Sequence, residues 1–247
     1  MKHDSLIPAL LSCLLFAGCA STEQPACNAK TYADAGLDHG LMQSPINILS
    51  AQTEDSGRHK ITLHFQDEIK AVENLGHTVQ LDFEEGSTIE GDGKTYHFKQ
   101  MHFHTPSEHL IDGMTFPMEL HIVNDVPPRN EDNIPHFLVI GVLFKMGRHN
   151  PFIAEVLRAI PEKRHAKAEL PAKQVRVHDL FTGDLDEELN NFYHYKGSLT
   201  TPPYTESVNW FVLKHIIEAS PEQIRIINEI EGDNARHIQG RYGRVVD

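Results

Sequence analysis

The chain has 247 residues and carries 22 Lys and Arg against 35 Asp and Glu, which gives a formal net charge of −13 with histidine neutral. This acidic balance argues against nucleic acid or an anionic lipid surface as a main partner. Three cysteines in this length exclude a small disulfide-rich scaffold, and 40% hydrophobic residues are enough for a sizeable core. The unusual count is 17 histidines, which directs attention to metal-binding spacings.

The first residues have the pattern of an export signal. Lys2 precedes an apolar run over residues 6–17 that is too short to span a bilayer as a stable helix. The string LFAGC at residues 15–19 resembles a bacterial lipobox, in which cleavage precedes a cysteine that is then acylated. We therefore expect an exported, periplasmic protein whose only membrane attachment is lipid on Cys19. The alternative is plain cleavage nearby, with Cys19 lost or left as a free thiol.

The rest of the chain shows no linker between two domains and no low-complexity tract. We divide the chain into a lipoprotein-type signal peptide (1–18), a short polar tether (19–30) and one folded domain (31–247). The most irregular internal stretch, residues 124–135, predicts a long surface loop between strands.

Sequence patterns in the folded domain are mostly those of β-strands. Residues 78–83 alternate, with Val79, Leu81 and Phe83 on one side. Other segments are rich in β-branched or aromatic residues, which favour strands. In chain order, the predicted strands are residues 61–65, 78–83, 94–104, 118–123, 137–144 and 208–213.

Helix signals are few. Asn150 before Pro151 predicts a helix that ends near residue 159. The string SPEQ at residues 220–223 has the pattern of a capping box and predicts a helix that ends near residue 230. Together these elements predict an α+β domain that is mostly β, with a large sheet and a few short peripheral helices.

The end of the predicted strand 94–104 has the spacing of a metal site. Because side chains of a strand alternate between its faces, Gln100, His102 and His104 lie on one face. Met101 and Phe103 then point the other way, toward a core. Two imidazoles at i and i+2 on one face can share an ion.

A third imidazole is available on the next predicted strand. His121 follows His104 by 17 residues, which allows one chain reversal and an antiparallel return. Three neutral imidazoles leave Zn²⁺ with its full charge and one open position, as in catalytic zinc sites. Gln100 and Glu119 lie on the same faces as these histidines and can accept hydrogen bonds from their second ring nitrogens.

Two other interpretations of this pattern stay open on the spacing alone. The histidines can be ordinary buried or surface residues of a sheet. The spacing of His102, His104 and Glu108 also fits a cupin, in which the glutamate is a ligand of iron or manganese. The glycine spacing that a cupin requires is poor, because Gly113 comes one residue early.

Longer segments resemble one enzyme family. They are QSPINI at residues 43–48, SEH at 107–109 beside the three histidines, and GSLTTPP at 197–203. These segments are similar to the motifs of α-class carbonic anhydrases, and the likeness runs from about residue 43 to about residue 239. The resemblance implies one domain with a central, mostly antiparallel, twisted sheet of about ten strands. Residues 31–247 are then the catalytic domain.

The same resemblance implies the reaction and the cofactor. The reaction is reversible hydration of carbon dioxide to bicarbonate and a proton, by attack of zinc-bound hydroxide. Zn²⁺ is the expected cofactor, sulfonamide-type anions are the expected inhibitors, and no nucleic acid is involved. The implied zinc ligands are His102, His104 and His121. Asn234 matches a residue whose backbone orients one of them, and His109 is expected to support the surroundings of Glu108.

The resemblance also implies how the nucleophile is oriented. Thr200 matches a threonine whose hydroxyl accepts a hydrogen bond from the zinc-bound hydroxide and donates one to a buried glutamate, here Glu108. A carboxylate can only accept, so it directs the threonine proton toward itself. Thr201 matches a residue that contacts bicarbonate.

Carbon dioxide and the released proton need further groups. An apolar molecule needs an apolar wall beside the ion, and a histidine of near-neutral pKa can carry the proton away. His77 matches the family's proton shuttle. The implied wall residues are Val123, Val139, Leu199 and Trp210. The alternative to an enzyme is a binding module that has the same fold but no catalytic activity. Such relatives usually lose a zinc histidine, whereas this chain keeps all three.

Overall fold

The computed structural model describes residues 40–54, 57, 59–64, 69–126, 135–181, 183 and 185–247. The predicted signal peptide, the tether and Cys19 lie outside these residues, and so do residues 127–134 of the predicted loop. No helix within the described ranges is both long and apolar enough to cross a membrane.

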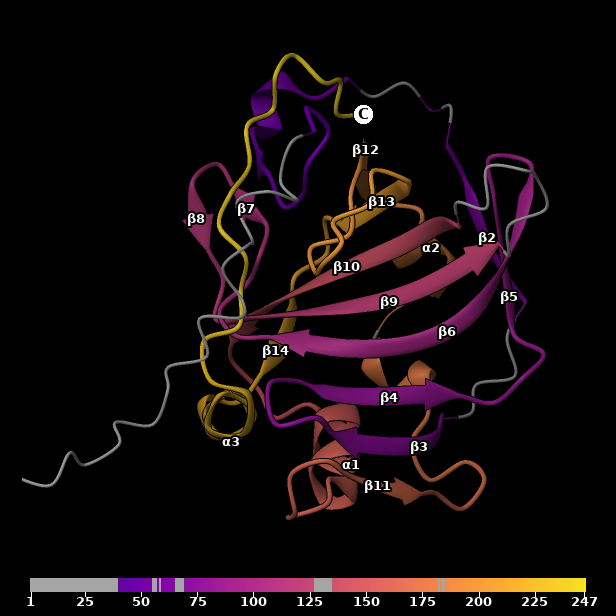
Figure 1. Ribbon diagram of the computed structural model, residues 1–247, viewed down its shortest axis with the longest axis vertical. Coiled ribbons are helices and arrows are strands. Elements are labelled where there is room, and N and C mark those ends of the chain that lie inside the picture. Colours follow the sequence, from indigo (N-terminus) through magenta and orange to yellow (C-terminus); the bar gives the residue numbers. More distant parts are fainter. Residues whose placement is uncertain are drawn as a thin grey trace, which may run out of the picture. The chain divides into compact units, whose positions relative to one another are not determined.

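An 11-stranded sheet forms the centre of the folded domain (Figure 1). Along its main path the strands are β11 (Ala166–Glu169), β3 (Ile69–Asn74), β4 (Val79–Phe83), β6 (Lys94–His104), β9 (Met118–Val126), β10 (His136–Met146), β13 (Val208–Leu213) and β12 (Phe192–Gly197). Off this path, β14 (Ile217–Ala219) pairs with β10, β5 (Thr88–Gly91) with β6, and β2 (Ile61–His64) with β5. β10 runs parallel to β13 and β14, and its pairing with β9 is antiparallel. The predicted large, mostly antiparallel sheet is thus confirmed, and the sheet is mixed.

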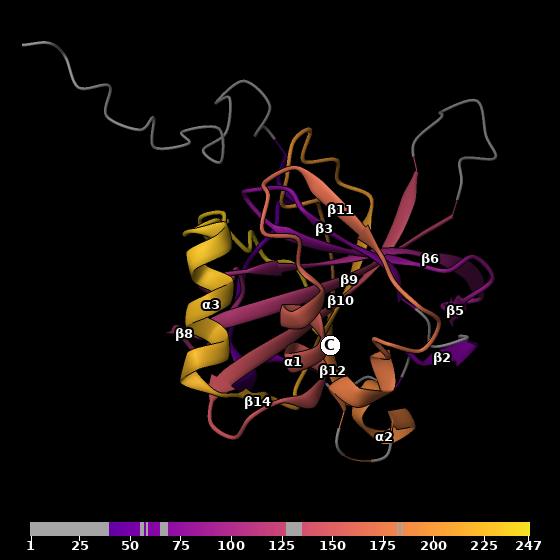
Figure 2. The same ribbon diagram turned by 90° about the horizontal axis from the view of Figure 1, so that it is seen from below.

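Short elements surround the large sheet. A small sheet joins β1 (Asn47–Ile48), β7 (Leu110–Ile111) and β8 (Met114–Thr115). The helices are α1 (Pro151–Ala159), α2 (Leu185–Leu189) and α3 (Pro221–Glu231), with 3-10 turns at Ser50–Gln52 and Val177–Leu180 (Figure 2). The predicted short peripheral helices are therefore present.

Both predicted helix starts carry the expected caps. The Asn150 side chain accepts from the Ile153 N–H at 3.1 Å, and Ser220 and Gln223 form a reciprocal capping box. Gln223 also accepts from the Asn150 N–H at 2.9 Å and donates to the Asn150 carbonyl at 2.7 Å. The two N-termini are thus joined, which fixes α1 against α3.

The sheet separates two apolar clusters. On one side, Met101 and Phe103 are fully buried in a cluster that also contains Phe152 of α1 and Ile227 of α3. On the other side, a smaller cluster includes Trp210 and shares its face of the sheet with the three histidines. The strand alternation that the sequence predicted therefore decides which side chains reach the candidate site.

Candidate metal centre

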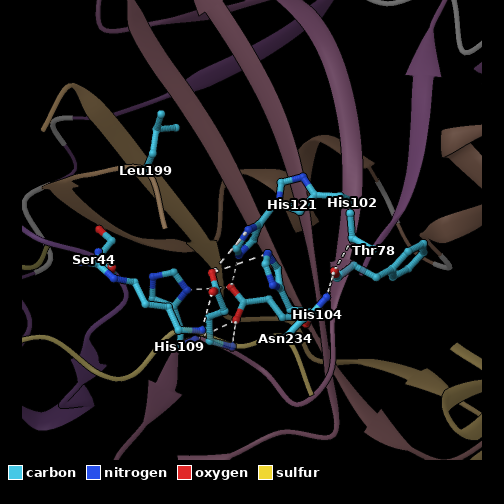
Figure 3. A network of polar contacts seen from close by, with 12 residues as sticks. Ser44, Thr78, His102, His104, His109, His121, Leu199 and Asn234 are labelled. Carbon is cyan, nitrogen blue, oxygen red and sulfur yellow. Dashed lines mark hydrogen bonds and ion pairs between the residues drawn. The ribbon is translucent and has the colours of Figure 1, made fainter. Parts of the chain in front are cut away.

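His102, His104 and His121 lie together on one face of β6 and β9. The two strands are antiparallel neighbours whose register places His102 directly opposite His121. The ring centroids are 4.9 Å apart for His102 and His104, 5.2 Å for His102 and His121, and 4.6 Å for His104 and His121. Each of the three rings offers one nitrogen, and these three nitrogens lie within 4.8 Å of one another (Figure 3). The three rings can therefore surround one ion.

Neighbouring side chains determine which nitrogens are free. Gln100 Oε1 lies 2.9 Å from His102 Nδ1, and Glu119 Oε1 lies 2.9 Å from His121 Nε2. Each oxygen accepts a hydrogen bond from the N–H group of its ring, which leaves His102 Nε2 and His121 Nδ1 as lone-pair donors. Both ring nitrogens of His104 are buried without a hydrogen-bond partner among the described residues.

These free nitrogens fit a zinc ion, which takes neutral imidazole ligands. Burial lowers the pKa of His102 well below its usual value, and it lowers the pKa of His104 to about 4. Burial also lowers the pKa of His121. The rings are thus neutral at pH 7, and the unpartnered nitrogens of His104 would be costly to bury without a ligand. In the described chain, the group of metal-ligating atoms that includes His102 and His104 contains no carboxylate.

Glu119 holds the environment of His121 in place. Its Oε1 also contacts His109 Nδ1 at 2.7 Å, and its Oε2 accepts from the N–H groups of Glu108 and His109 at 2.9 and 2.8 Å. Burial alone would raise the pKa of Glu119, but the charges of His109 and His121 and its hydrogen bonds with these two rings hold the pKa well below its usual value. The His109 ring thus bonds Glu119, the carboxylate that also accepts from the Glu108 N–H.

His109 connects this network to the segment QSPINI at residues 43–48. Its Nε2 lies 2.6 Å from the Tyr195 hydroxyl, which donates to Ser44 Oγ at 2.9 Å. Three segments far apart in the sequence are therefore linked to the ring of His121 through Glu119.

Glu108 is buried directly behind the histidines. Its Oε1 accepts from the Arg236 N–H at 2.8 Å, and its Oε2 lies 3.6 Å from His104 Nε2 and 3.9 Å from His121 Nδ1. Burial raises the pKa of Glu108, whereas His121 and the hydroxyl of Thr200 act to lower it. The structure therefore brings Thr200 and Glu108 together beside two of the three rings.

The Asn234 side chain forms hydrogen bonds with the backbone on both sides of His104. Its side chain accepts from the Thr105 N–H at 3.0 Å and donates to the carbonyls of Phe103 at 3.3 Å and His77 at 2.9 Å. Asn234 also acts to raise the pKa of His104, against the larger effect of burial. The side chain of Asn234, rather than only its backbone, thus positions this segment.

The residues expected to form the apolar wall lie across three adjacent strands. Val123 on β9 is opposite Val139 on β10, and Val139 is opposite Trp210 on β13. These three side chains are buried, and Leu199 is half-buried against the same cluster. Thr201 is exposed.

His77 lies in the turn between β3 and β4 and is exposed. Its Nδ1 lies 3.2 Å from the Leu75 carbonyl. It is near enough to His102 for its charge to contribute to the lowered pKa of that ring. The structure therefore places an exposed imidazole near the histidine cluster.

Sequence reasoning missed two groups that position these residues. The Arg236 guanidinium donates to Gln43 Oε1 at 2.9 Å and to the Ser44 carbonyl at 2.6 Å. Glu231 is buried at the end of α3 and accepts from the Val79 N–H at 2.9 Å, two residues after His77. The arginine lies two residues after Asn234, whereas no local pattern marks Glu231.

Comparisons with known proteins agree on one family. The family model for eukaryotic-type carbonic anhydrase matches residues 25–246. A carbonic anhydrase of Pectobacterium carotovorum is 37% identical over 224 residues, 90% of this chain and 86% of that protein. The α-carbonic anhydrase of Photobacterium profundum superposes with a TM-score of 0.73 at 32% identity, covering 85% of this chain and 90% of the other.

A second solved structure is the complex of the α-carbonic anhydrase from Thermovibrio ammonificans with the inhibitor sulfanilamide. It superposes with a TM-score of 0.73 at 35% identity, covering 84% of this chain and 87% of the other. The cupin interpretation is therefore wrong. The chain belongs to the eukaryotic-type, or α-class, carbonic anhydrase family, whose enzymes hydrate carbon dioxide reversibly.

Proposed function

We propose that this protein hydrates carbon dioxide to bicarbonate and a proton with zinc held by His102, His104 and His121. The observation that carries the proposal is the set of free ring nitrogens. Gln100 and Glu119 occupy the outer nitrogens of two rings, and both nitrogens of His104 are buried without a partner in the described chain. When bound, zinc supplies a positive charge that lowers the pKa of a coordinated water to about 7.

Glu108 and Thr200 orient the attacking oxygen. The Glu108 carboxylate can only accept hydrogen bonds, and its Oε1 already accepts from the Arg236 N–H. The Thr200 hydroxyl therefore donates its hydrogen bond to this carboxylate. Its oxygen, Oγ1, is then free to accept a hydrogen bond from the nucleophile. The nucleophile then presents an oxygen lone pair to the substrate, and this orientation is fixed before reaction.

The apolar wall binds the substrate. Val123, Val139 and Trp210 present a continuous apolar surface across three strands beside His121, whose ring centroid is 4.8 Å from that of Trp210. Carbon dioxide has no net dipole, so such a surface holds it without competing with water for hydrogen bonds.

His77 exchanges the product proton with solvent. We expect His77→Ala to slow turnover by about 10-fold to 10²-fold in weak buffer, because an exposed imidazole would then be missing from the proton path. Added imidazole should restore part of the rate. Stopped-flow hydration measured at low and high buffer concentration checks this.

A matched control for that variant is His149→Ala, which removes another exposed imidazole. It should leave the rate unchanged at every buffer concentration. An unchanged rate for His77→Ala in weak buffer would mean that another group carries the proton.

Inhibition by a sulfonamide tests the proposed function as a whole. Sulfanilamide ionises at its sulfonamide nitrogen and can bind a metal there as an anion, and it is the inhibitor in the Thermovibrio ammonificans complex. We expect it to abolish carbon dioxide hydration by this protein. An analogue with two methyl groups on that nitrogen cannot ionise and should not inhibit. Equal inhibition by both compounds, or by neither, would contradict a metal-centred reaction.

A further inference from the structure

A second group of metal-ligating side chains lies away from the three-histidine centre. His59, Asp92 and His194 each offer a ligand atom, and these atoms lie within 4.8 Å of one another. The three residues come from the segment before β2, the turn between β5 and β6, and β12. Asp247 adds a second carboxylate, since its Oδ2 lies 3.1 Å from His59 Nε2.

The cluster is on the opposite side of β12 from the catalytic network. His194 and Tyr195 are consecutive in this strand, so their side chains point to opposite faces. Tyr195 contacts His109, whereas the His194 ring packs against Phe211 and stacks on His59, with ring centroids 4.9 Å and 3.7 Å away. Occupancy of this cluster can therefore be measured independently of the catalytic centre.

One nitrogen of the cluster lacks a partner. His194 is only 4% exposed, and its Nε2 is buried without a hydrogen-bond partner in the described chain. A buried imidazole nitrogen without a partner is costly, and a metal ion is one ligand that would satisfy it. A cavity of about 430 Å³, lined in part by His59, His194 and Asp247, gives an ion access from solvent.

The carboxylates beside His59 favour a cation, whereas Lys196 and Arg244 line the same cavity with positive charge. His59 Nδ1 lies 2.7 Å from Asp92 Oδ1, and its Nε2 faces Asp247, so the ring lies between two carboxylates. If an ion binds one nitrogen of this ring, the other nitrogen keeps its carboxylate partner, as is usual for metal-bound histidine. Two neutral imidazoles and two carboxylates around a divalent ion give a site with no net charge.

We propose that His59, Asp92 and His194 form a second binding site for a divalent transition-metal ion such as Zn²⁺. The ion would tie β12 to the turn between β5 and β6, and Asp247 is held to β12 by two 2.9 Å backbone hydrogen bonds with His194. Binding requires the stacked rings of His59 and His194 to separate from 3.7 Å toward the spacings of about 5 Å at the three-histidine centre. The second site is therefore weaker than the first.

Titration of the zinc-loaded protein with further Zn²⁺ tests this site. By calorimetry, we expect one additional equivalent to bind and to raise the melting temperature. In Asp92→Asn the affinity for this equivalent should fall at least 10-fold. Asn tolerates the positive φ of 50° at this position, so the turn should survive. His59→Gln gives a second variant with the same expected loss, should Asp92→Asn fail to fold.

The control is His64→Gln, which removes an exposed imidazole 3.7 Å from Glu90 on the neighbouring strands. It should bind the additional equivalent as the unaltered protein does. The proposal is overturned if the unaltered protein takes up no additional ion, if both cluster variants bind it with unchanged affinity, or if the control loses it equally. Because no readout is catalytic, these outcomes are independent of the reaction at the first site.

Discussion

His102→Ala is expected to abolish carbon dioxide hydration and to strip the tightly held zinc. Only two imidazoles would remain, and two ligands cannot hold a tetrahedral ion well. The loss of metal affinity should be at least about 10²-fold, because even groups that only support a ligand contribute 10-fold to 10²-fold. Metal analysis after dialysis, together with stopped-flow hydration on the same sample, measures both effects.

His97→Ala is the matched control for this variant. His97 lies on the same strand, β6, but is exposed and belongs to no group of metal-ligating atoms in the described chain. It should keep its metal and its rate. Full activity in His102→Ala would contradict the assignment of this histidine as a ligand.

Thr200→Ala is expected to lower the hydration rate by about 10²-fold while zinc stays bound. The variant loses one oriented hydrogen bond at the reacting group, and losses of this kind are about 10²-fold to 10³-fold. Thr200 is not among the ligand atoms, so metal content should not change. The pair of measurements separates orientation of the nucleophile from metal binding.

Thr200→Ser is the matched control variant, because it keeps the hydroxyl that faces Glu108. It should retain most of the rate that Thr200→Ala loses. If Thr200→Ala instead releases zinc, or if serine fails to restore the rate, the threonine acts through the structure of its loop and not through its hydroxyl.

The geometry of the three histidines could be predicted because it depends on strand periodicity alone. Side chains two residues apart share a face of β6, and one chain reversal brings β9 alongside in antiparallel register. The same rule placed Gln100 beside His102 and Glu119 beside His121, two residues from each ring. The observed bounds of β6 and β13 equal the predicted ranges, because both segments contain runs of strand-forming residues.

Other strands could not be predicted from local pattern. β5 has only four residues and ends in Gly91, β12 ends in Gly197, and β3 contains Lys70 and Glu73. Pairing with neighbours in the sheet stabilises such segments, and that information is not local.

The roles of Glu108 and Thr200 came from family resemblance and not from spacing. They are 92 positions apart, and loops bring them to the same place behind the histidines. The cluster of His59, Asp92 and His194 was not predicted at all, because its members come from three separate segments and no motif contains two of them. Sites assembled across the sheet therefore require the fold, whereas a site within two adjacent strands does not.

Removal and return of the metal tests whether hydration depends on zinc at the three histidines. Protein treated with a chelator and dialysed should hold no zinc and should not hydrate carbon dioxide above the uncatalysed rate. One equivalent of Zn²⁺ per chain should restore full activity, because the three-histidine centre binds more tightly than the second site. Hydration that persists in metal-free protein, or purified protein that carries iron instead of zinc, would contradict the account.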